Sequence, residues 1–136
     1  DFVEPTKIYS DRILELDKAF DIHGMMHITG GAYTKLRQES PSEPLPLNAD
    51  AIIRRGHCLK PQDIFFEIHK RGVTDYDMYN TFNCGVGFTL SASKEEAKKI
   101  LDDLNRTLQA DIIGEIVPGT GKIKIESMFS DTQVEY

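Results

Sequence analysis

The segment Met78–Leu104, which reads MYNTFNCGVGFTLSASKEEAKKILDDL, decides the fold class because a strand and a helix follow one another within it. A glycine-bearing loop leads into Val86–Ala92, an apolar run that predicts a strand. Ser93 and Glu96 then form a capping box, which is typical of a helix N-terminus. Apolar residues recur at helical spacing after this box, so we expect the longest helix of the chain to continue to Leu108.

Helical and strand-like patterns also alternate on the N-terminal side of this segment. We expect an amphipathic helix from Pro5 to Phe20, a strand at Met25–Thr29, a short helix at Ala32–Gln38, a strand at Ala51–Ile53, a helix from Pro61 to Gly72 and a helical turn at Thr74–Thr81. Between the short helix and the second strand, residues 40–48 hold three of the six prolines and predict a surface loop.

The C-terminal part of the chain predicts two strands, Ile112–Val117 and Lys122–Ile125, joined as a hairpin by the turn Pro118–Gly121. Helices mixed with strands in this order indicate an α+β fold, with a mixed, largely antiparallel sheet flanked by helices. The sequence contains no internal repeat and no linker long enough to divide it. We therefore expect residues 1–136 to form a single domain.

The composition narrows the classes of partner and compartment. The net charge is -6, from 16 basic and 22 acidic residues, which argues against nucleic acid or an anionic membrane as the main partner. The apolar runs are too short for a membrane span. Cys58 and Cys84 form no disulfide framework, so we expect a reducing, cytoplasmic location. The chain opens at Asp1 without an initiator Met, and we expect it to be a piece of a longer protein.

The run Met25–Gly31, MMHITGG, has the features of an anion-binding turn. A buried strand ends in Thr29 and two glycines, and a helix follows, so free backbone N–H groups gather at Gly30 and Gly31. Glycines also let a ligand approach the backbone closely. A strand-to-helix turn needs glycine for structural reasons too, and the pattern alone favours that interpretation. His27 is likewise either a hydrogen-bonded core histidine or a catalytic residue.

The run Thr81–Gly87, TFNCGVG, is a second glycine-bearing loop and precedes a strand. Asn83 can donate and accept hydrogen bonds from this loop, and Gly85 and Gly87 keep the start of the strand open to a ligand. A β-bulge or a tight turn into the strand would explain the same glycines. Taken alone, the pattern favours this structural interpretation.

Two further patterns lack the spacing that their chemistry needs. Gly119–Lys122 suggests a phosphate-binding P-loop, but the earlier glycine and the following Ser or Thr of that motif are absent. His23 and His27 have the spacing of a helical zinc pair, but Gly24 lies between them and no nearby Glu completes the motif. We therefore predict no metal site within this chain.

Four segments in order resemble the phosphoribosylformylglycinamidine cyclo-ligase family, also called aminoimidazole ribonucleotide synthetase. The segments are Pro5–Tyr9 (PTKIY), His27–Gly31 (HITGG), Met78–Gly87 (MYNTFNCGVG) and Ile113–Gly119 (IGEIVPG). Together they extend over nearly the whole chain, and the third is the most specific. The resemblance implies a two-domain enzyme of which this chain is the C-terminal domain. The N-terminal domain, which would bind most of the ATP and Mg²⁺ and form the homodimer, is absent from the chain.

The resemblance also implies a reaction and a set of site residues. The family converts formylglycinamidine ribonucleotide and ATP to aminoimidazole ribonucleotide, and its active site lies between the domains. This chain would then supply one wall, with its own N-terminal domain and a phosphorylated small molecule as partners. The resemblance implies that His27 is catalytic. By the same inference, the residues that bind the substrate or its phosphate are Thr29, Gly30, Gly31, Asn83 and Gly85.

One position departs from the family pattern. Where the family usually has a third glycine, this chain has Ala32. A positive φ there would cost about 1 kcal/mol, so we expect instead that Ala32 lies in the ordinary first turn of a helix. Two alternative functions stay open. One is another ATP-using member of the superfamily, such as a formylglycinamidine ribonucleotide synthetase, and the other is a non-catalytic binding module of the same fold.

Overall fold

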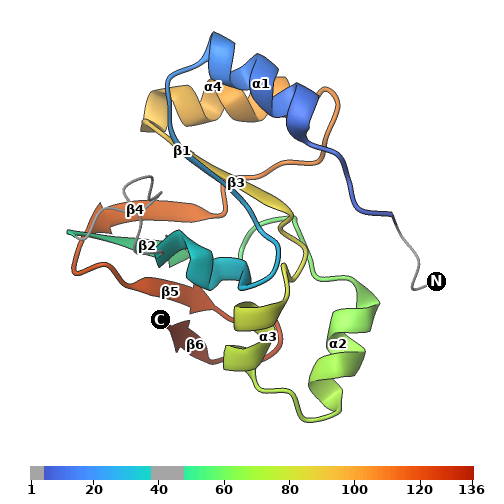
Figure 1. The fold of residues 1–136 in the computed structure, drawn as a ribbon. Coiled ribbons are helices and arrows are strands. Elements are labelled where there is room, and N and C mark those ends of the chain that lie inside the picture. Colours follow the sequence, from blue (N-terminus) through green and yellow to red (C-terminus); the bar gives the residue numbers. More distant parts are fainter. Residues whose placement is uncertain (1–4, 38–47) are drawn as a thin grey trace.

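The structure is a computed structural model and describes residues 5–37 and 48–136 (Figure 1). Its elements are α1 (Ser10–Ala19), β1 (Ile22–His27), the 3-10 helix η1 (Ala32–Arg37), β2 (Ala49–Ile53), α2 (Asp63–Lys70), α3 (Asp75–Thr81), β3 (Phe88–Ala92), α4 (Lys94–Leu104), β4 (Gly114–Pro118), β5 (Ile123–Glu126) and β6 (Gln133–Glu135). The mixture of helices with largely antiparallel strands confirms the predicted α+β class.

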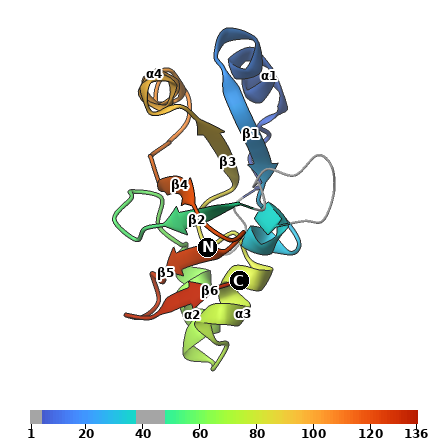
Figure 2. The same ribbon diagram turned by 90° about the vertical axis from the view of Figure 1, so that its left-hand side faces the viewer.

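The described strands form two sheets rather than the single sheet expected from the sequence. β1 and β3 make a two-stranded antiparallel sheet, and the other strands make a four-stranded sheet in the order β4-β2-β5-β6. In the larger sheet only the β2–β5 pair is parallel. Figures 1 and 2 show α1 and α4 side by side at the end of the molecule where β1 and β3 lie, with α2 and α3 at the opposite end.

The predicted hairpin between the strands now labelled β4 and β5 is wrong. Both strands pair with β2, which lies between them. The connection crosses the start of β2, where the buried Asp50 carboxylate accepts hydrogen bonds from the backbone N–H groups of Thr120 (2.7 Å) and Lys122 (2.9 Å). Turn chemistry identifies a reversal of the chain, but it does not say whether another strand fits between the two arms. The true C-terminal hairpin is β5–β6, and the sequence did not reveal the three-residue β6.

Element boundaries follow local chemistry where capping side chains are present. The Ser93 hydroxyl accepts from the Glu96 N–H, as the predicted capping box requires, and Thr74 caps α3 through the Asp77 N–H. The first helix begins at Ser10, not near Pro5, and α4 ends at Leu104, four residues before the predicted end. The predicted surface loop and the last residue of the short helix fall mainly on residues 38–47, which lie outside the described residues.

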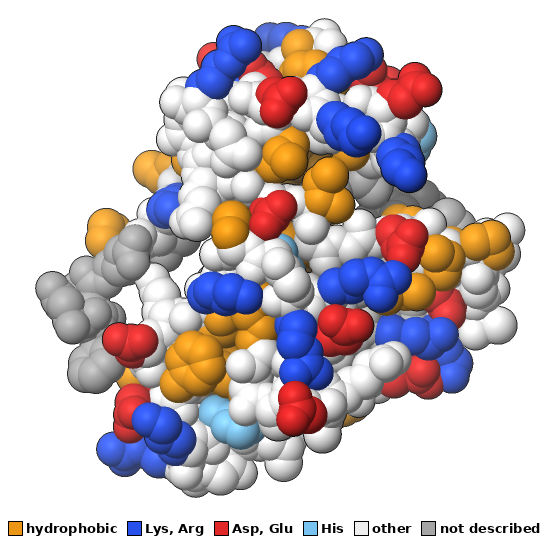
Figure 3. Space-filling model, turned by 180° about the vertical axis from the view of Figure 1, so that it is seen from behind, with side chains coloured by type: hydrophobic (Ala, Val, Ile, Leu, Met, Phe, Trp, Pro, Cys, Tyr) orange, Lys and Arg blue, Asp and Glu red, His pale blue; other side chains and the backbone are white. Residues whose placement is uncertain are grey.

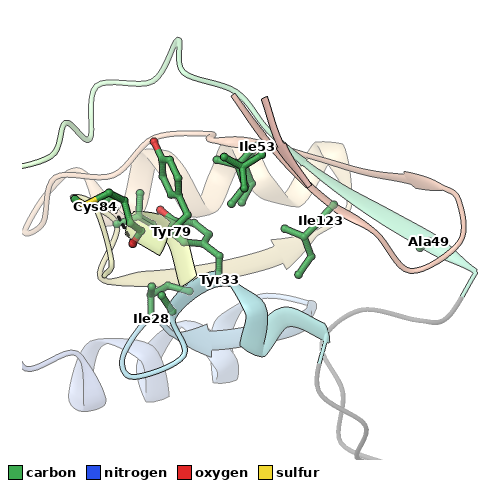
Figure 4. Close-up of a cluster of buried hydrophobic side chains, with 13 residues drawn as sticks. Ile28, Tyr33, Ala49, Ile53, Tyr79, Cys84 and Ile123 are labelled. Atoms are coloured by element: carbon green, nitrogen blue, oxygen red, sulfur yellow. Dashed lines mark hydrogen bonds between the residues drawn. The ribbon is translucent and has the colours of Figure 1, made fainter. Parts of the chain in front are cut away.

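Two apolar clusters support these layers. The larger cluster lies between the four-stranded sheet and the helices η1 and α3, and includes buried Tyr33, Met78 and Ile123 (Figure 4). The smaller one joins α1 to α4 through Ile13 and Ile100. Burial of each large apolar side chain contributes about 1.5–3 kcal/mol, so the larger cluster dominates stability.

The surface carries charges of both signs. Figure 3 shows basic and acidic side chains interspersed on the face opposite to that of Figure 1. Ion pairs also join neighbouring strands of the four-stranded sheet, as between Arg54 and Glu115 and between Lys122 and Glu135. Within residues 5–37 and 48–136, no helix has both the length and the apolar character needed to cross a membrane.

Candidate functional site

The two glycine-bearing loops lie side by side. The Ile28 N–H donates to the Gly87 carbonyl at 2.9 Å, which continues the antiparallel pairing of β1 and β3 beyond their ends. The buried Tyr33 hydroxyl donates to the Asn83 carbonyl at 3.0 Å and so ties η1 to the second loop. The structure therefore brings the residues predicted from two separate motifs onto one surface.

The turn after β1 is tighter than the sequence suggested. The Ala32 N–H donates to the Thr29 carbonyl at 2.6 Å, and the Thr34 N–H donates to the Gly31 carbonyl at 3.1 Å. The helix that follows is a 3-10 helix of six residues, not an α-helix, so a helix dipole contributes little here. Any anion held at this turn depends on its N–H groups and on nearby side chains.

The expectation for Ala32 was wrong. Ala32 is the first residue of η1, but its φ is +40°, and it follows Gly31 at φ +80°. Left-handed backbone costs an alanine about 1 kcal/mol relative to glycine. The methyl group is fully buried in the larger apolar cluster, with 0% exposure. That burial offsets part of the strain, and it explains how the turn keeps its shape without a third glycine.

The two glycines of the turn have different reasons to be glycine. Gly31 needs a positive φ, and a Cβ there would lie 3.2 Å from Cγ of Lys35, whose stem crosses it. Gly30 has no positive φ, and a Cβ there would meet nothing within 4 Å. The described residues therefore give Gly30 no internal reason to lack a side chain, whereas close approach of a ligand to the backbone would give one.

Lys35 is a residue that the sequence analysis missed. Its ammonium donates to the His27 carbonyl at 2.9 Å and to Thr29 Oγ1 at 2.5 Å. It thereby places a positive charge directly at the predicted anion-binding turn. A basic residue one helical turn after a glycine pair was the available signal, but spacing alone does not show where a flexible side chain folds.

His27 lies at the exposed end of β1 in a group of three rings. Its ring centroid lies 5.7 Å from that of Tyr9 and 5.8 Å from that of Phe88. In the described part of the chain, no side chain or backbone group is within hydrogen-bonding distance of its ring nitrogens. His27 is therefore not the buried, internally bonded histidine of the alternative interpretation, and its imidazole is accessible to a ligand.

The same rings border a surface hollow of about 420 Å³. The residues that line it are Thr6, Lys7, Ile8, Tyr9, Ser10, His27 and Phe88. Burial raises the pKa of Tyr9 above its ordinary value, so its hydroxyl stays protonated at neutral pH and can donate. A Cβ at Gly87 would overlap that hydroxyl, which explains the glycine. The hollow combines aromatic side chains with one basic residue, Lys7, a lining suited to a planar anionic ligand.

Asn83 and Gly85 have structural roles in the second loop. The Asn83 side-chain oxygen accepts from the Gly85 N–H at 3.1 Å, and the intervening Cys84 has φ +47°. Gly85 has φ +94°, and a Cβ there would overlap the Lys60 carbonyl. Burial raises the pKa of the Cys84 thiol to about 12, so it is not a nucleophile at neutral pH. Substrate binding by Asn83 and Gly85 stays a prediction.

Asp75, the first residue of α3, is an internal anchor. His69 Nε2 lies 2.6 Å from one carboxylate oxygen, and the hydroxyls of Ser130 and Thr132 donate to the other. Burial opposes ionisation, but hydrogen bonds from these groups and from Ser127 outweigh it and hold the Asp75 pKa well below its ordinary value. The carboxylate thus joins α2, α3 and the β5–β6 connection.

The described site residues do not fit a magnesium ion. None of the side chains named at the turn, the second loop or the hollow is a carboxylate, which Mg²⁺ prefers. In residues 5–37 and 48–136, no group of three or more His, Cys, Asp or Glu side chains is placed to hold a metal ion. The turn, with one ammonium and one hydroxyl, instead fits an anionic oxygen.

Comparison with known proteins agrees with the four-segment resemblance. A family model described as "AIR synthase related protein, C-terminal domain" matches residues 1–126. The chain belongs to this family. It is 36% identical over 141 residues to the phosphoribosylformylglycinamidine cyclo-ligase of Methanococcus maripaludis (strain C6), an alignment that covers 100% of this chain and 37% of the relative. The match to the protein of the same name from Clostridium novyi is 41% over 97 residues, covering 71% and 28%.

A third relative extends the same pattern. The phosphoribosylformylglycinamidine cyclo-ligase of Methanothermobacter thermautotrophicus is 32% identical over 133 residues, which cover 97% of this chain and 36% of the relative. The alignments therefore cover between 28% and 37% of the length of these relatives.

Proposed function

We propose that this chain is the C-terminal domain of an ATP-dependent cyclo-ligase that forms aminoimidazole ribonucleotide in purine biosynthesis. The observation that carries the proposal is similarity over the whole chain to proteins named for that reaction. The exposed turn at Thr29–Gly31 supports it, since the fold itself does not require a glycine at position 30. In this proposal the chain forms one wall of a site between two domains.

The chemistry assigns a task to each group at this surface. An amide oxygen is a poor leaving group, and ATP supplies the phosphoryl group that makes it a good one. The Lys35 ammonium, the Thr29 hydroxyl and the backbone at Gly30 are placed to hold an anionic oxygen of the substrate or of the transferred phosphoryl group. His27 is accessible, and an imidazole can both donate and accept a proton, so it is our candidate to move a proton when the ring closes.

The groups that bind ATP and Mg²⁺ are proposed to lie elsewhere in the full-length protein. We propose that an N-terminal domain binds ATP and Mg²⁺, because the described residues at this site offer no carboxylates for the metal. Two halves of a cleft must meet to hold both reacting ends of one substrate in attack geometry. We also propose a cytoplasmic homodimer for the full-length protein, by analogy with the family.

A chimaera tests the proposed function. The matching C-terminal part of the M. maripaludis cyclo-ligase is replaced by this chain, and ADP release is measured with and without formylglycinamidine ribonucleotide. We expect substrate-dependent ADP release with formation of aminoimidazole ribonucleotide, whereas the chain alone shows neither. ADP release that depends only on a different superfamily substrate would favour the alternative ligase. Tight substrate binding without turnover would favour a non-catalytic module.

A further inference from the structure

The Lys35 ammonium constrains the direction in which Thr29 can donate a hydrogen bond. An ammonium has three N–H donors and no acceptor, so in its contact with Thr29 Oγ1 the hydroxyl oxygen must accept. The hydroxyl proton is then not used in that contact. It is available to an acceptor outside the turn, and the exposed position of Thr29 leaves it accessible.

The same contact fixes the ammonium itself. Lys35 also donates to the His27 carbonyl at 2.9 Å, so two of its three N–H groups have partners on either side of the Ile28 peptide unit. Its stem crosses Gly31, where a Cβ would lie 3.2 Å from Lys35 Cγ. These two hydrogen bonds hold the ammonium end of the lysine, which removes part of the rotational freedom that an exposed lysine ordinarily keeps.

We propose that Lys35 is a positioning residue of the candidate site, which turns the Thr29 hydroxyl into a donor toward an anionic oxygen bound over Gly30. This inference rests on the proposed function and deepens it. An oxygen that accepts from the Thr29 hydroxyl lies within about 6 Å of the ammonium, because each of the two contacts spans at most about 3 Å. At that separation the charge acts inside the Debye length of about 8 Å. The proposed effect comes from the ammonium and the hydroxyl, and it needs no contribution from the short helix that follows.

The two side chains should then act as one unit. Removing the ammonium frees Thr29 Oγ1 to rotate and to donate elsewhere, and removing the hydroxyl leaves the ammonium without its link to the ligand. Either loss removes the same charge-assisted hydrogen bond, which is usually worth about tenfold or more in affinity. The effects of the two substitutions should therefore not add.

The test uses the ¹⁵N-labelled 136-residue chain and inorganic phosphate as the probe, at constant ionic strength. Amide shifts of Gly30 and Gly31 report binding, and thermal unfolding reports stability. Lys35→Met keeps the stem that crosses Gly31 and removes the charge. We expect it and Thr29→Val each to weaken phosphate binding about tenfold, and the double variant to bind no more weakly than the weaker single variant. Lys35→Arg and Thr29→Ser should restore most of the affinity.

Lys98→Met is the matched control, because it removes the same charge from an exposed position on α4. We expect it to leave phosphate binding unchanged. The inference is overturned if Lys35→Met binds phosphate as the parent chain does, if the two single effects add, or if the parent chain shows no response to phosphate at all. Failure of the proposed function is a separate result, since it would show as a chimaera without substrate-dependent ADP release.

Discussion

Substituting Gly30 by alanine separates a ligand-binding role from a structural one, because the fold has room for the added methyl group. The φ of Gly30 is not in the left-handed region, and beyond its two chain neighbours an added Cβ would meet no atom of the described residues within 4 Å. Alanine in place of glycine at such a position stabilises a protein by about 0.4–1 kcal/mol, since it restricts the unfolded chain. For a domain of this size, that corresponds to a rise of about 1–5 °C in the unfolding temperature.

The same methyl group should impair function. It projects into open space above the turn where we place an anionic oxygen, and it would force that oxygen away from the backbone. A loss of about 1.4–2.7 kcal/mol of transition-state stabilisation corresponds to a fall of about 10- to 100-fold in kcat/KM of the chimaera. We therefore expect Gly30→Ala to be more stable than the parent and less active.

Gly31→Ala provides the matched comparison. Its φ of +80° and the nearby stem of Lys35 make an alanine there destabilising, by about 1 kcal/mol or more. Loss of activity at position 31 therefore cannot distinguish a binding role from a structural one. Position 30 can do so. A Gly30→Ala chimaera with near-normal kcat/KM, together with unchanged or raised stability, would refute the idea that a ligand approaches the backbone here.

Three other substitutions test separate parts of the structure. His27→Asn should reduce kcat of the chimaera about 100-fold. The unfolding temperature should change little, because the ring is exposed. An unchanged kcat would show that His27 does not transfer the proton. Gly114→Ala should destabilise the chain by about 1–3 kcal/mol in urea unfolding, since the new Cβ would overlap the Ile52 carbonyl across the β2–β4 pair. A urea midpoint equal to that of the parent chain would contradict this packing. Asp75→Asn should lower the free energy of unfolding at pH 7 by about 2 kcal/mol, also measured in urea, because a side chain only 14% exposed loses charge-assisted hydrogen bonds. A decrease of less than about 0.3 kcal/mol would show that this anchor contributes little to stability.

Local chemistry predicted much of the fold from the sequence. The capping box at Ser93 and the helical turn after Thr74 needed only residues within one turn of the chain, and both are present. The insertion of β2 between β4 and β5 depends on contacts between residues about 70 apart, such as Asp50 with Lys122, and no local pattern contains them. This is why the elements were largely found while the predicted hairpin was wrong.

At the candidate site, too, features set by the local sequence could be predicted, and features set by the fold of the chain could not. The glycine pair and His27 were recognisable because backbone freedom and side-chain type are written in the sequence. The contribution of Lys35 was not, because it depends on a long side chain folding back across Gly31. Likewise, the sequence does not distinguish a glycine that the backbone needs for a positive φ from a glycine whose missing side chain lets a ligand approach. Only the surrounding atoms distinguish Gly31 and Gly85 from Gly30.

The pH dependence of stability should separate the anchors of the fold from the candidate site. Asp50 and Asp75 both have a folded-state pKa held below the ordinary value, Asp50 chiefly by the Lys122 N–H and the Lys124 ammonium. A depressed pKa means that the unfolded chain binds the proton more readily, so the stability from these groups is complete above about pH 4 and is lost as the pH falls further. Neither carboxylate is among the groups that form the turn. Below about pH 5, where inorganic phosphate stays a monoanion, acid should therefore unfold the chain without first weakening phosphate binding at Gly30, and Asp75→Asn should flatten the acid limb of the stability curve. Loss of the Gly30 phosphate response below about pH 5, but before unfolding begins, would show instead that the turn depends on a carboxylate.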